Sequence, residues 1–209
     1  VSFGSSAMLA VVNVVLRAPT AAAGTSAAVE VGEHGRAHAG LRGAFEVGGG
    51  AALAWSAAAY SSAGPDLYFA EYDDAETGGG RTRDTDWDRG RSATLRASFR
   101  QLDVTAFATT REKGIPTGSY DDAFDDRRAA SRDDWLLVGL DWSRQLSRGW
   151  SLTTRASAGH YAYDGYYPDV DLLYRHSSAS AWWTVEAQAT WEQRADSRLT
   201  AGVELRRAT

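Results

Sequence analysis

The sequence contains no cysteine and no long apolar run. Without cysteine, the chain forms neither a disulfide nor a zinc-thiolate site, and a cysteine nucleophile is excluded. No apolar stretch approaches the roughly 18 residues that a membrane-spanning helix needs, so we do not expect a helical membrane protein. A membrane β-barrel remains allowed, because its strands are only about 9 to 11 residues long and alternate apolar with polar side chains.

Basic residues are too few for a nucleic-acid surface. The 209 residues include 22 Lys and Arg against 27 Asp and Glu, a net charge of -5, whereas phosphate binding needs a basic face. No nucleophile motif, phosphate-binding loop or metal-hydrolase helix is present, so we expect neither an enzyme nor a cofactor. The opening residues VSFGSS lack the basic and apolar segments of a signal peptide, which predicts a mature form or a fragment if the protein is exported.

Aromatic residues and alternating patterns are abundant instead. Eight Trp, nine Tyr and 21 Gly suit strands and turns. The clearest alternation, from Trp183 to Trp191, places apolar side chains on one side of a strand and polar side chains on the other. Similar alternation, strong or weak, predicts nine strands in all, the others being near 25–33, 37–47, 51–62, 93–100, 103–111, 136–143, 150–163 and 199–206.

The predicted connections alternate in length. Short turns are expected at 48–50, 102–103, 146–149 and 195–197. Long polar loops are expected at 63–90, 112–133 and 164–178, and the short segment 33–36 is an exception. Short turns at one end and long loops at the other are typical of outer-membrane barrels.

Two further residue classes fit such a barrel. Aromatic residues near strand ends fit the girdles at the membrane interfaces: Trp142, Trp150, Trp183 and Trp191. Charged residues on the polar sides of strands should face the lumen, because each would cost about 2 to 4 kcal/mol in hydrocarbon: Glu30, Arg42, Glu46, Arg96, Arg100, Asp141, Arg155, Glu186, Glu204 and Arg206.

The opening segment 3–17, FGSSAMLAVVNVVLR, resembles the end of the plug domain in TonB-dependent outer-membrane receptors. The family pattern is roughly Tyr-Gly-Ser-x-Ala-x-x-Gly-Val-Ile-Asn-Ile-Val-Thr-Lys. The matching motif residues are Gly4, Ser5, Ala7 and Asn13, whereas Ala10 and Leu16 depart from it. Because alanine disfavours positive φ, we expect the turn at Ala10 to differ in detail from the family's glycine turn.

Three later stretches are similar to the barrel of one branch of these receptors: DLYFAEYDD at 66–74, REKGIPT at 111–117 and YDGYYP at 163–168. The resemblance implies that residues 1–20 end the plug and that 21–209 form the N-terminal portion of the barrel. A complete receptor has about twenty-two strands. We therefore expect a partial sequence whose all-β, antiparallel up-and-down meander of about nine strands is open.

The same resemblance implies a function. Such receptors take up a scarce solute, namely a ferric siderophore, haem, cobalamin or a glycan, across the bacterial outer membrane. The implied partners are outer-membrane lipid, the small-molecule ligand and the periplasmic TonB energy-coupling protein, which would act through an N-terminal part not included here. The candidate ligand contacts are loop aromatics: Tyr68, Phe69, Tyr72, Trp87, Tyr120, Tyr166 and Tyr167.

Two alternatives belong to other classes. A small stand-alone outer-membrane barrel with a structural or adhesive role would need an even strand number and no plug segment. A soluble carbohydrate-binding β-sandwich would bury its apolar faces between two sheets and would have short connections at both ends.

Possible metal ligands do not form a complete set. Asp84, Asp86 and Asp88 have the spacing of the first half of a calcium loop, but the later Gly and Glu are missing, so a solvated acidic loop is the favoured interpretation. The histidine pairs His34 with His38 and His160 with His176 lack further ligands. In the segment 120–128, carboxylates lie beside arginines in the sequence. They could bind a polar ligand, but loop ion pairs, each contributing under roughly 1 kcal/mol, are the favoured interpretation.

Overall fold

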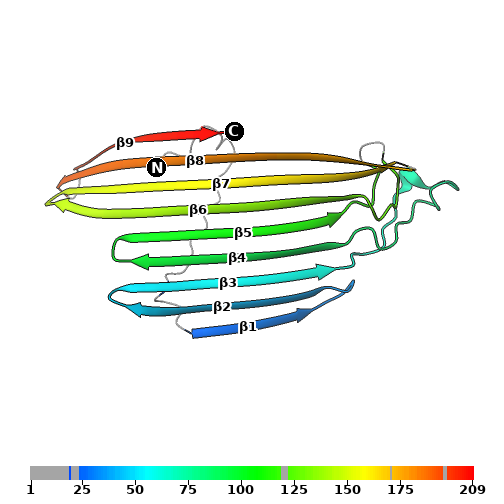
Figure 1. The fold of residues 1–209 in the computed structure, drawn as a ribbon, viewed down its shortest axis with the longest axis horizontal. Helices are drawn as coiled ribbons and strands as arrows, with labels where there is room; N and C mark the ends of the chain where they lie inside the picture. The colour runs from blue at the N-terminus through cyan, green and yellow to red at the C-terminus, as the bar shows by residue number, and fades with distance from the viewer. Residues whose placement is uncertain (1–18, 20–23, 119–121, 170, 195–196) are drawn as a thin grey trace.

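The computed structural model describes residues 19, 24–118, 122–169, 171–194 and 197–209. They form one antiparallel sheet of nine strands in the order β1 to β9, so that each strand pairs with its neighbours in sequence (Figure 1). The sheet does not close, because β1 and β9 do not pair with each other. The predicted open, all-β, up-and-down meander is therefore confirmed. The plug motif lies outside the described residues.

The strands lengthen from β1 to β8, and β9 is short again. Their bounds are β1 Gly24–Val31, β2 Ala37–Gly48, β3 Ala51–Ser62, β4 Asp88–Phe99, β5 Leu102–Gly114, β6 Ala130–Ser147, β7 Trp150–Asp169, β8 Leu172–Arg194 and β9 Ser197–Ala208. A 3-10 helix, η2 (Ala70–Tyr72), lies in the connection between β3 and β4. All nine predicted strands are present, but β6, β7 and β8 extend well beyond their predicted bounds, and β8 begins eleven residues earlier than predicted.

The two long connections both lie at one end of the sheet, where the β1–β2 and β7–β8 connections are short (Figure 1). Glycine at positive φ makes several short turns, as at Gly149 with φ of 82°. A Cβ on Gly149 would lie 2.5 Å from the carbonyl oxygen of Glu192, so only glycine fits this turn. The turn between β4 and β5 is at 100–101, not 102–103. The long connections 63–87 and 115–129 lie at the opposite end.

The predicted third loop, 164–178, is wrong. β7 continues to Asp169 and β8 begins at Leu172, so this segment is a hairpin whose strands pair almost to the tip. Polar composition suggested a loop, but cross-strand contacts hold the strands together: Arg175 and Ser177 both bond to Asp164, at 2.8 and 2.5 Å. Trp183 consequently lies in the middle of β8 and does not mark a strand end, contrary to its predicted girdle position.

The two faces of the sheet differ in chemistry. We call one the apolar face; it carries a row of registered neighbours from β3 to β8, namely Trp55, Leu95, Ala106, Val138, Ala158 and Trp183. We call the other the polar face; the adjacent row on it, from β4 to β9, is Arg96, Thr105, Gly139, Ser157, Thr184 and Arg206. Period-two alternation across antiparallel strands produces this division.

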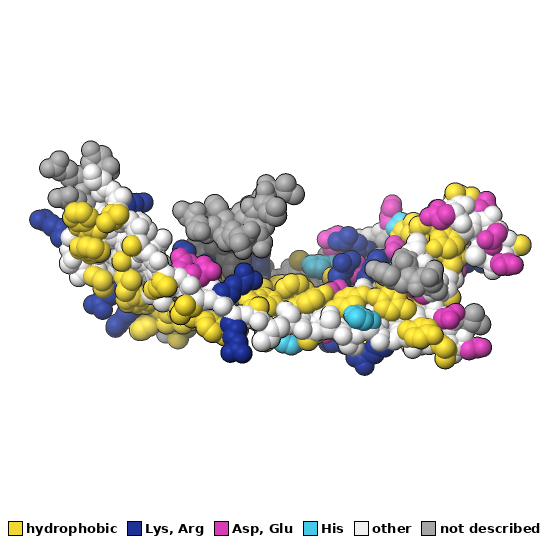
Figure 2. All heavy atoms as spheres, turned by 90° about the horizontal axis from the view of Figure 1, so that it is seen from above, with side chains coloured by type: hydrophobic (Ala, Val, Ile, Leu, Met, Phe, Trp, Pro, Cys, Tyr) yellow, Lys and Arg dark blue, Asp and Glu magenta, His cyan; other side chains and the backbone are white. Residues whose placement is uncertain are grey.

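The apolar face is the more exposed of the two. Along β4, the apolar-face residues from Arg89 to Leu95 are exposed, whereas the polar-face residues between them are half-buried. Val29 and Val203 are 80% and 60% exposed, and the buried hydrophobic side chains among the described residues are Ala44, Ala52 and Ala129. Figure 2 shows the curved sheet with hydrophobic side chains over much of the visible surface. Contiguous exposed apolar surface of this kind is uncommon on soluble monomers.

The turn end of the apolar face carries three of the predicted girdle tryptophans. Trp150 and Trp191 are registered partners on β7 and β8, with their rings stacked at 6.1 Å. Trp142 lies on the same face, opposite Thr154. All three side chains therefore lie near the turn ends of the three longest strands, β6 to β8.

Candidate ligand-binding site

Three large aromatic side chains form a cluster on the polar face. Trp135 of β6 lies against Tyr161 of β7 with ring centroids 4.4 Å apart, and its edge meets Trp182 of β8 at 6.1 Å. We call this cluster the aromatic shelf. Trp135 is 39% exposed, so its ring can accept a further planar or sugar ring by stacking.

Gly159 makes room for the shelf. A Cβ at this position would lie 2.3 Å from the Trp182 ring and 2.8 Å from Leu137. Trp182 therefore lies flat over the bare backbone of β7. The missing side chain permits this close approach, and Gly159 has no positive φ that would itself require glycine.

Polar contacts continue from the shelf toward the long connections. The Tyr161 hydroxyl donates to the Asp133 carboxylate at 2.5 Å, and the Tyr163 and Tyr167 hydroxyls are 2.8 Å apart. On β3 to β5 of the same face, Asp88 accepts from Tyr60 at 2.9 Å and from Arg111 at 2.6 Å. The shelf is thus followed by hydroxyl, carboxylate and guanidinium groups that could orient a polar ligand.

The described residues of the connections 63–87 and 115–129 pack together as one unit, which we call the loop cap. Asp125 accepts from the Arg83 backbone N–H at 2.8 Å and from the Thr85 hydroxyl at 2.9 Å. Thr85 is only 1% exposed. Phe124 stacks on Tyr72 at 4.3 Å and meets Phe69 edge-on at 6.1 Å. These contacts give the loop cap an ordered interior.

Charge and hydrogen bonding shape the surface of the loop cap. The hydroxyl and backbone N–H of Thr77, both 2.8 Å from Asp74 Oδ1, lower the pKa of that carboxyl. The Arg128 guanidinium, 2.7 Å away, lowers the pKa of Asp126. The hydrogen bond to Asp73 raises the pKa of Tyr68. Figure 2 shows acidic side chains gathered at this end of the molecule.

The predicted ligand contacts fall in three places. Tyr68, Phe69, Tyr72 and Trp87 belong to the loop cap, where Phe69 and Tyr72 pack internally. The rings of Tyr68 and Trp87 instead lie under the guanidinium groups of Arg81 and Arg89, which are 5.6 and 5.1 Å from the ring centroids. Tyr167 lies on the polar face and Tyr166 on the apolar face, so the two cannot contact one ligand together. Tyr120 lies outside the described residues.

The three spaced aspartates point to different cations. Asp84 pairs with Arg127 at 3.6 Å, Asp86 with Lys113, and Asp88 with Arg111. Within the described part of the chain, no group of three His, Cys, Asp or Glu side chains is arranged to hold a metal ion. His160 and His176 lie on opposite faces of the sheet, so they cannot share a ligand.

The predicted lumen charges lie on the polar face, apart from Arg100, which lies in the turn between β4 and β5. Asp141, Arg155, Glu186 and Glu204 are registered neighbours on β6 to β9. Arg155 lies 3.1 Å from Asp141 and 3.8 Å from Glu186. A charged row therefore crosses the polar face below the shelf.

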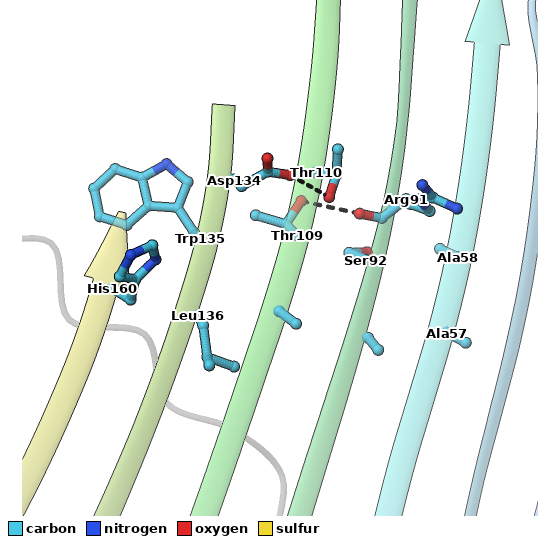
Figure 3. A pocket seen from close by; sticks show the side chains of 12 residues that line it. Ala57, Ala58, Arg91, Ser92, Thr109, Thr110, Asp134, Trp135, Leu136 and His160 are labelled. Atoms are coloured by element: carbon cyan, nitrogen blue, oxygen red, sulfur yellow. Dashed lines mark hydrogen bonds between the residues drawn. The ribbon is translucent and has the colours of Figure 1, made fainter. Parts of the chain in front are cut away.

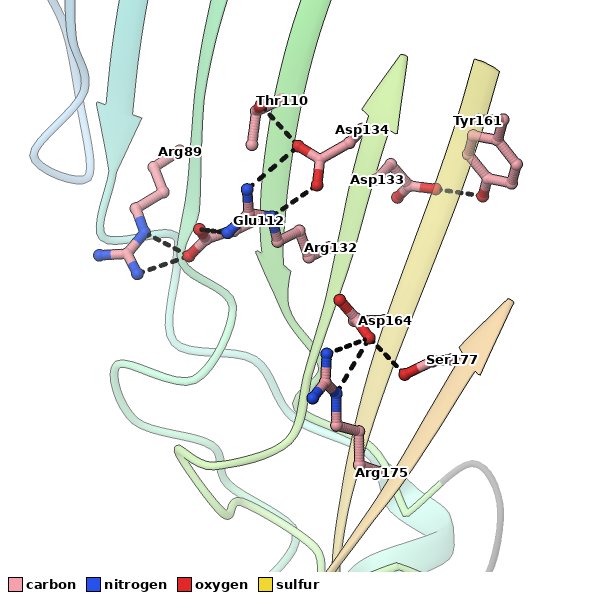
Figure 4. A network of polar contacts seen from close by, with 10 residues as sticks. All are labelled: Arg89, Thr110, Glu112, Arg132, Asp133, Asp134, Tyr161, Asp164, Arg175 and Ser177. Atoms are coloured by element: carbon pink, nitrogen blue, oxygen red, sulfur yellow. Dashed lines mark hydrogen bonds and ion pairs between the residues drawn. The ribbon is translucent and has the colours of Figure 1, made fainter. Parts of the chain in front are cut away.

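Sequence reasoning missed the aromatic shelf and a charged belt. The signal for the shelf was available, because Trp182 and Trp183 are adjacent in a strand and must lie on opposite faces. The belt lies on the apolar face beside the loop cap, where Glu112 bonds to Arg89 at 2.5 Å and Arg132 to Asp134 at 2.8 Å (Figure 4). Its members are Arg89, Arg91, Thr110, Glu112, Arg132, Asp134, Asp164, Arg175 and Ser177.

No helix among the described residues is long and apolar enough to cross a membrane. Comparison of the chain with protein-family models and with curated proteins gives no match.

Proposed function

We propose that this chain forms part of the wall of an outer-membrane β-barrel receptor of the TonB-dependent kind, which takes up a scarce solute. The observation that carries the proposal is the exposed apolar face, which runs across the middle of the sheet, whereas the polar face carries charged pairs there, such as Asp141 with Arg155. Lipid would cover the apolar face, and the polar face would line the lumen. The sorted connections support the same orientation, with the loop cap outside the cell.

The ligand would enter past the loop cap and meet the aromatic shelf. Trp135 and Tyr161 offer ring faces, and the neighbouring Tyr60, Asp88 and Arg111 offer hydrogen bonds. Stacking surfaces with a few polar groups suit a ferric siderophore, haem, cobalamin or a glycan. Movement of the ligand through the barrel would draw on the periplasmic energy-coupling protein, so uptake should depend on the inner-membrane proton gradient.

A soluble β-sandwich explains fewer of these observations than a receptor wall does. A second sheet could cover the apolar face. The aromatic shelf would then face solvent, and Trp135 and Trp182 would not be part of a hydrophobic core. Long connections at one end alone also disfavour the sandwich. A stand-alone structural barrel would not need the shelf, and it predicts no solute binding.

Uptake by cells that express the complete protein tests the proposal. We expect the protein in the outer-membrane fraction and expect uptake of one radiolabelled member of the four solute classes, abolished by a protonophore. Trp135→Ala should weaken binding of that solute, whereas Trp150→Ala, at the turn end of the apolar face, should leave it unchanged. Recovery in a soluble fraction, or no binding of any of the four classes, would overturn the proposal.

A further inference from the structure

A hollow crosses the apolar face just below the charged belt (Figure 3). Its floor consists of registered alanines on β3, β4 and β5, namely Ala57, Ala93 and Ala108. Leu136 and His160 continue the same row. We call this hollow the alanine trough. Its volume is about 440 Å³, within the range of roughly 300 to 1,000 Å³ that small-molecule sites occupy.

A second hollow of about 440 Å³ lies next to the trough, within the charged belt. Its lining is more polar than that of the trough and includes Ser61, Arg89 and Glu112. Arg91 and Thr110 line both hollows. An apolar surface hollow and a more polar one therefore meet at Arg91.

Arg91 is the belt cation whose charge is left uncompensated. Arg89 pairs with Glu112, Arg132 with Asp134 and Arg175 with Asp164. In the part of the chain that the structure describes, the Arg91 guanidinium has no such partner; only its backbone carbonyl accepts a bond, from Thr109. The belt can thus accept one negative charge at Arg91 without breaking an existing ion pair.

We propose that the alanine trough and Arg91 bind one anionic phospholipid on the outside of the sheet. An acyl chain would lie along Ala57, Ala93 and Ala108, where small side chains leave room, and the phosphate would accept hydrogen bonds from the Arg91 guanidinium. The inference rests on the proposed membrane placement of the apolar face. It adds a lipid site that uptake of a solute does not require.

The test uses the complete protein, purified in detergent, stripped of lipid and incubated with phosphatidylglycerol or phosphatidylcholine. Native mass spectrometry counts the retained lipids. We expect about a five-fold preference for phosphatidylglycerol, the factor for one arginine near an anionic headgroup. Arg91→Gln should abolish the preference and Arg91→Lys should retain most of it. Ala93→Leu, which fills the trough, should lower retention of both lipids.

Arg144→Gln is the matched control, because Arg144 is exposed on the apolar face at the turn end, away from the trough. It should keep the five-fold preference. An unchanged preference in Arg91→Gln would overturn the inference, as would displacement of the lipid by inorganic phosphate alone or occlusion of the trough by a second copy of the chain. Flotation with vesicles separates the two proposals: wild-type protein that floats with neither lipid contradicts the membrane placement itself.

Discussion

The two faces of the sheet are made by the same strands, yet they expose side chains of opposite polarity. The apolar face presents Leu95, Val138 and Val185 with 40% or more of each exposed, whereas the polar face engages its charges in pairs such as Asp141 with Arg155. A water-soluble protein has the reverse arrangement, with apolar groups hidden and charges outward. The comparison supports the proposal that the apolar face is not in contact with water, and that a ligand would bind on the polar face.

The largest expected effect comes from placing a charge on each face at adjacent positions of β5. Ala106→Arg should lower the free energy of unfolding by about 2 to 4 kcal/mol in lipid vesicles, because the guanidinium would enter hydrocarbon. Thr105→Arg, on the polar face, should change it by no more than about 0.5 kcal/mol. Denaturant titration followed by tryptophan fluorescence measures both. Equal effects of the two variants would remove the distinction between the faces.

Two glycines on the polar face, Gly159 and Gly139, test how the aromatic shelf is held in place. Gly159→Ala places a methyl group against Trp182 and should cost about 1 to 3 kcal/mol as the ring is displaced. Gly139→Ala is the matched control, because a Cβ there meets nothing within 4 Å. The same denaturant titration, together with the tryptophan emission spectrum, measures the effect. If both variants behave alike, Trp182 does not depend on Gly159 for its place in the shelf.

A third variant tests whether the loop cap is stabilised independently of the two faces of the sheet. Asp125→Ala leaves the buried Thr85 hydroxyl without its acceptor and should destabilise the cap by about 1 to 3 kcal/mol. Asp84→Ala is the matched control, because Asp84 has a φ of 54°, close to the 55° of Asp125, and loses the exposed pair with Arg127, worth under roughly 1 kcal/mol. Hydrogen exchange should rise in 63–87 and 115–129 for the first variant only. Faster exchange throughout the strands would instead make the cap part of the sheet's stability.

The smallest effect is a loosening of the loop cap in acid. The pKa values of Asp74 and Asp126 are lowered in the folded chain, so their contribution is present above the unfolded pKa of about 3.9 and is lost as pH falls through the folded pKa. We expect exchange, corrected for the intrinsic rate, to increase in the cap between pH 5 and about pH 3. Asp74→Asn should show a weaker response. An identical response in this variant would contradict a role for Asp74.

Alternation predicted most of the fold, because successive side chains of a strand point to opposite faces and the two faces of this sheet differ in polarity. It failed at 164–178, where Asp164 and Arg175 look like loop residues but form a cross-strand pair. The shelf was open to prediction from the adjacent Trp182 and Trp183. The loop cap was not, because the contact of Asp125 with Thr85 joins two connections far apart in the sequence. The charged belt was not predicted either, because its polar residues lie at strand positions whose other side chains are mostly apolar.

The central claim is that lipid covers the apolar face and water reaches the polar face. Since the chain has no cysteine, single cysteines at successive positions 103 to 108 of β5 can carry a spin label without background. In the complete protein in vesicles, we predict that labels at even positions are accessible to oxygen and shielded from a water-soluble nickel complex, with the reverse at odd positions. Shielding of the even positions from both reagents, as in a packed sandwich core, or exposure of both faces to water, would contradict the account.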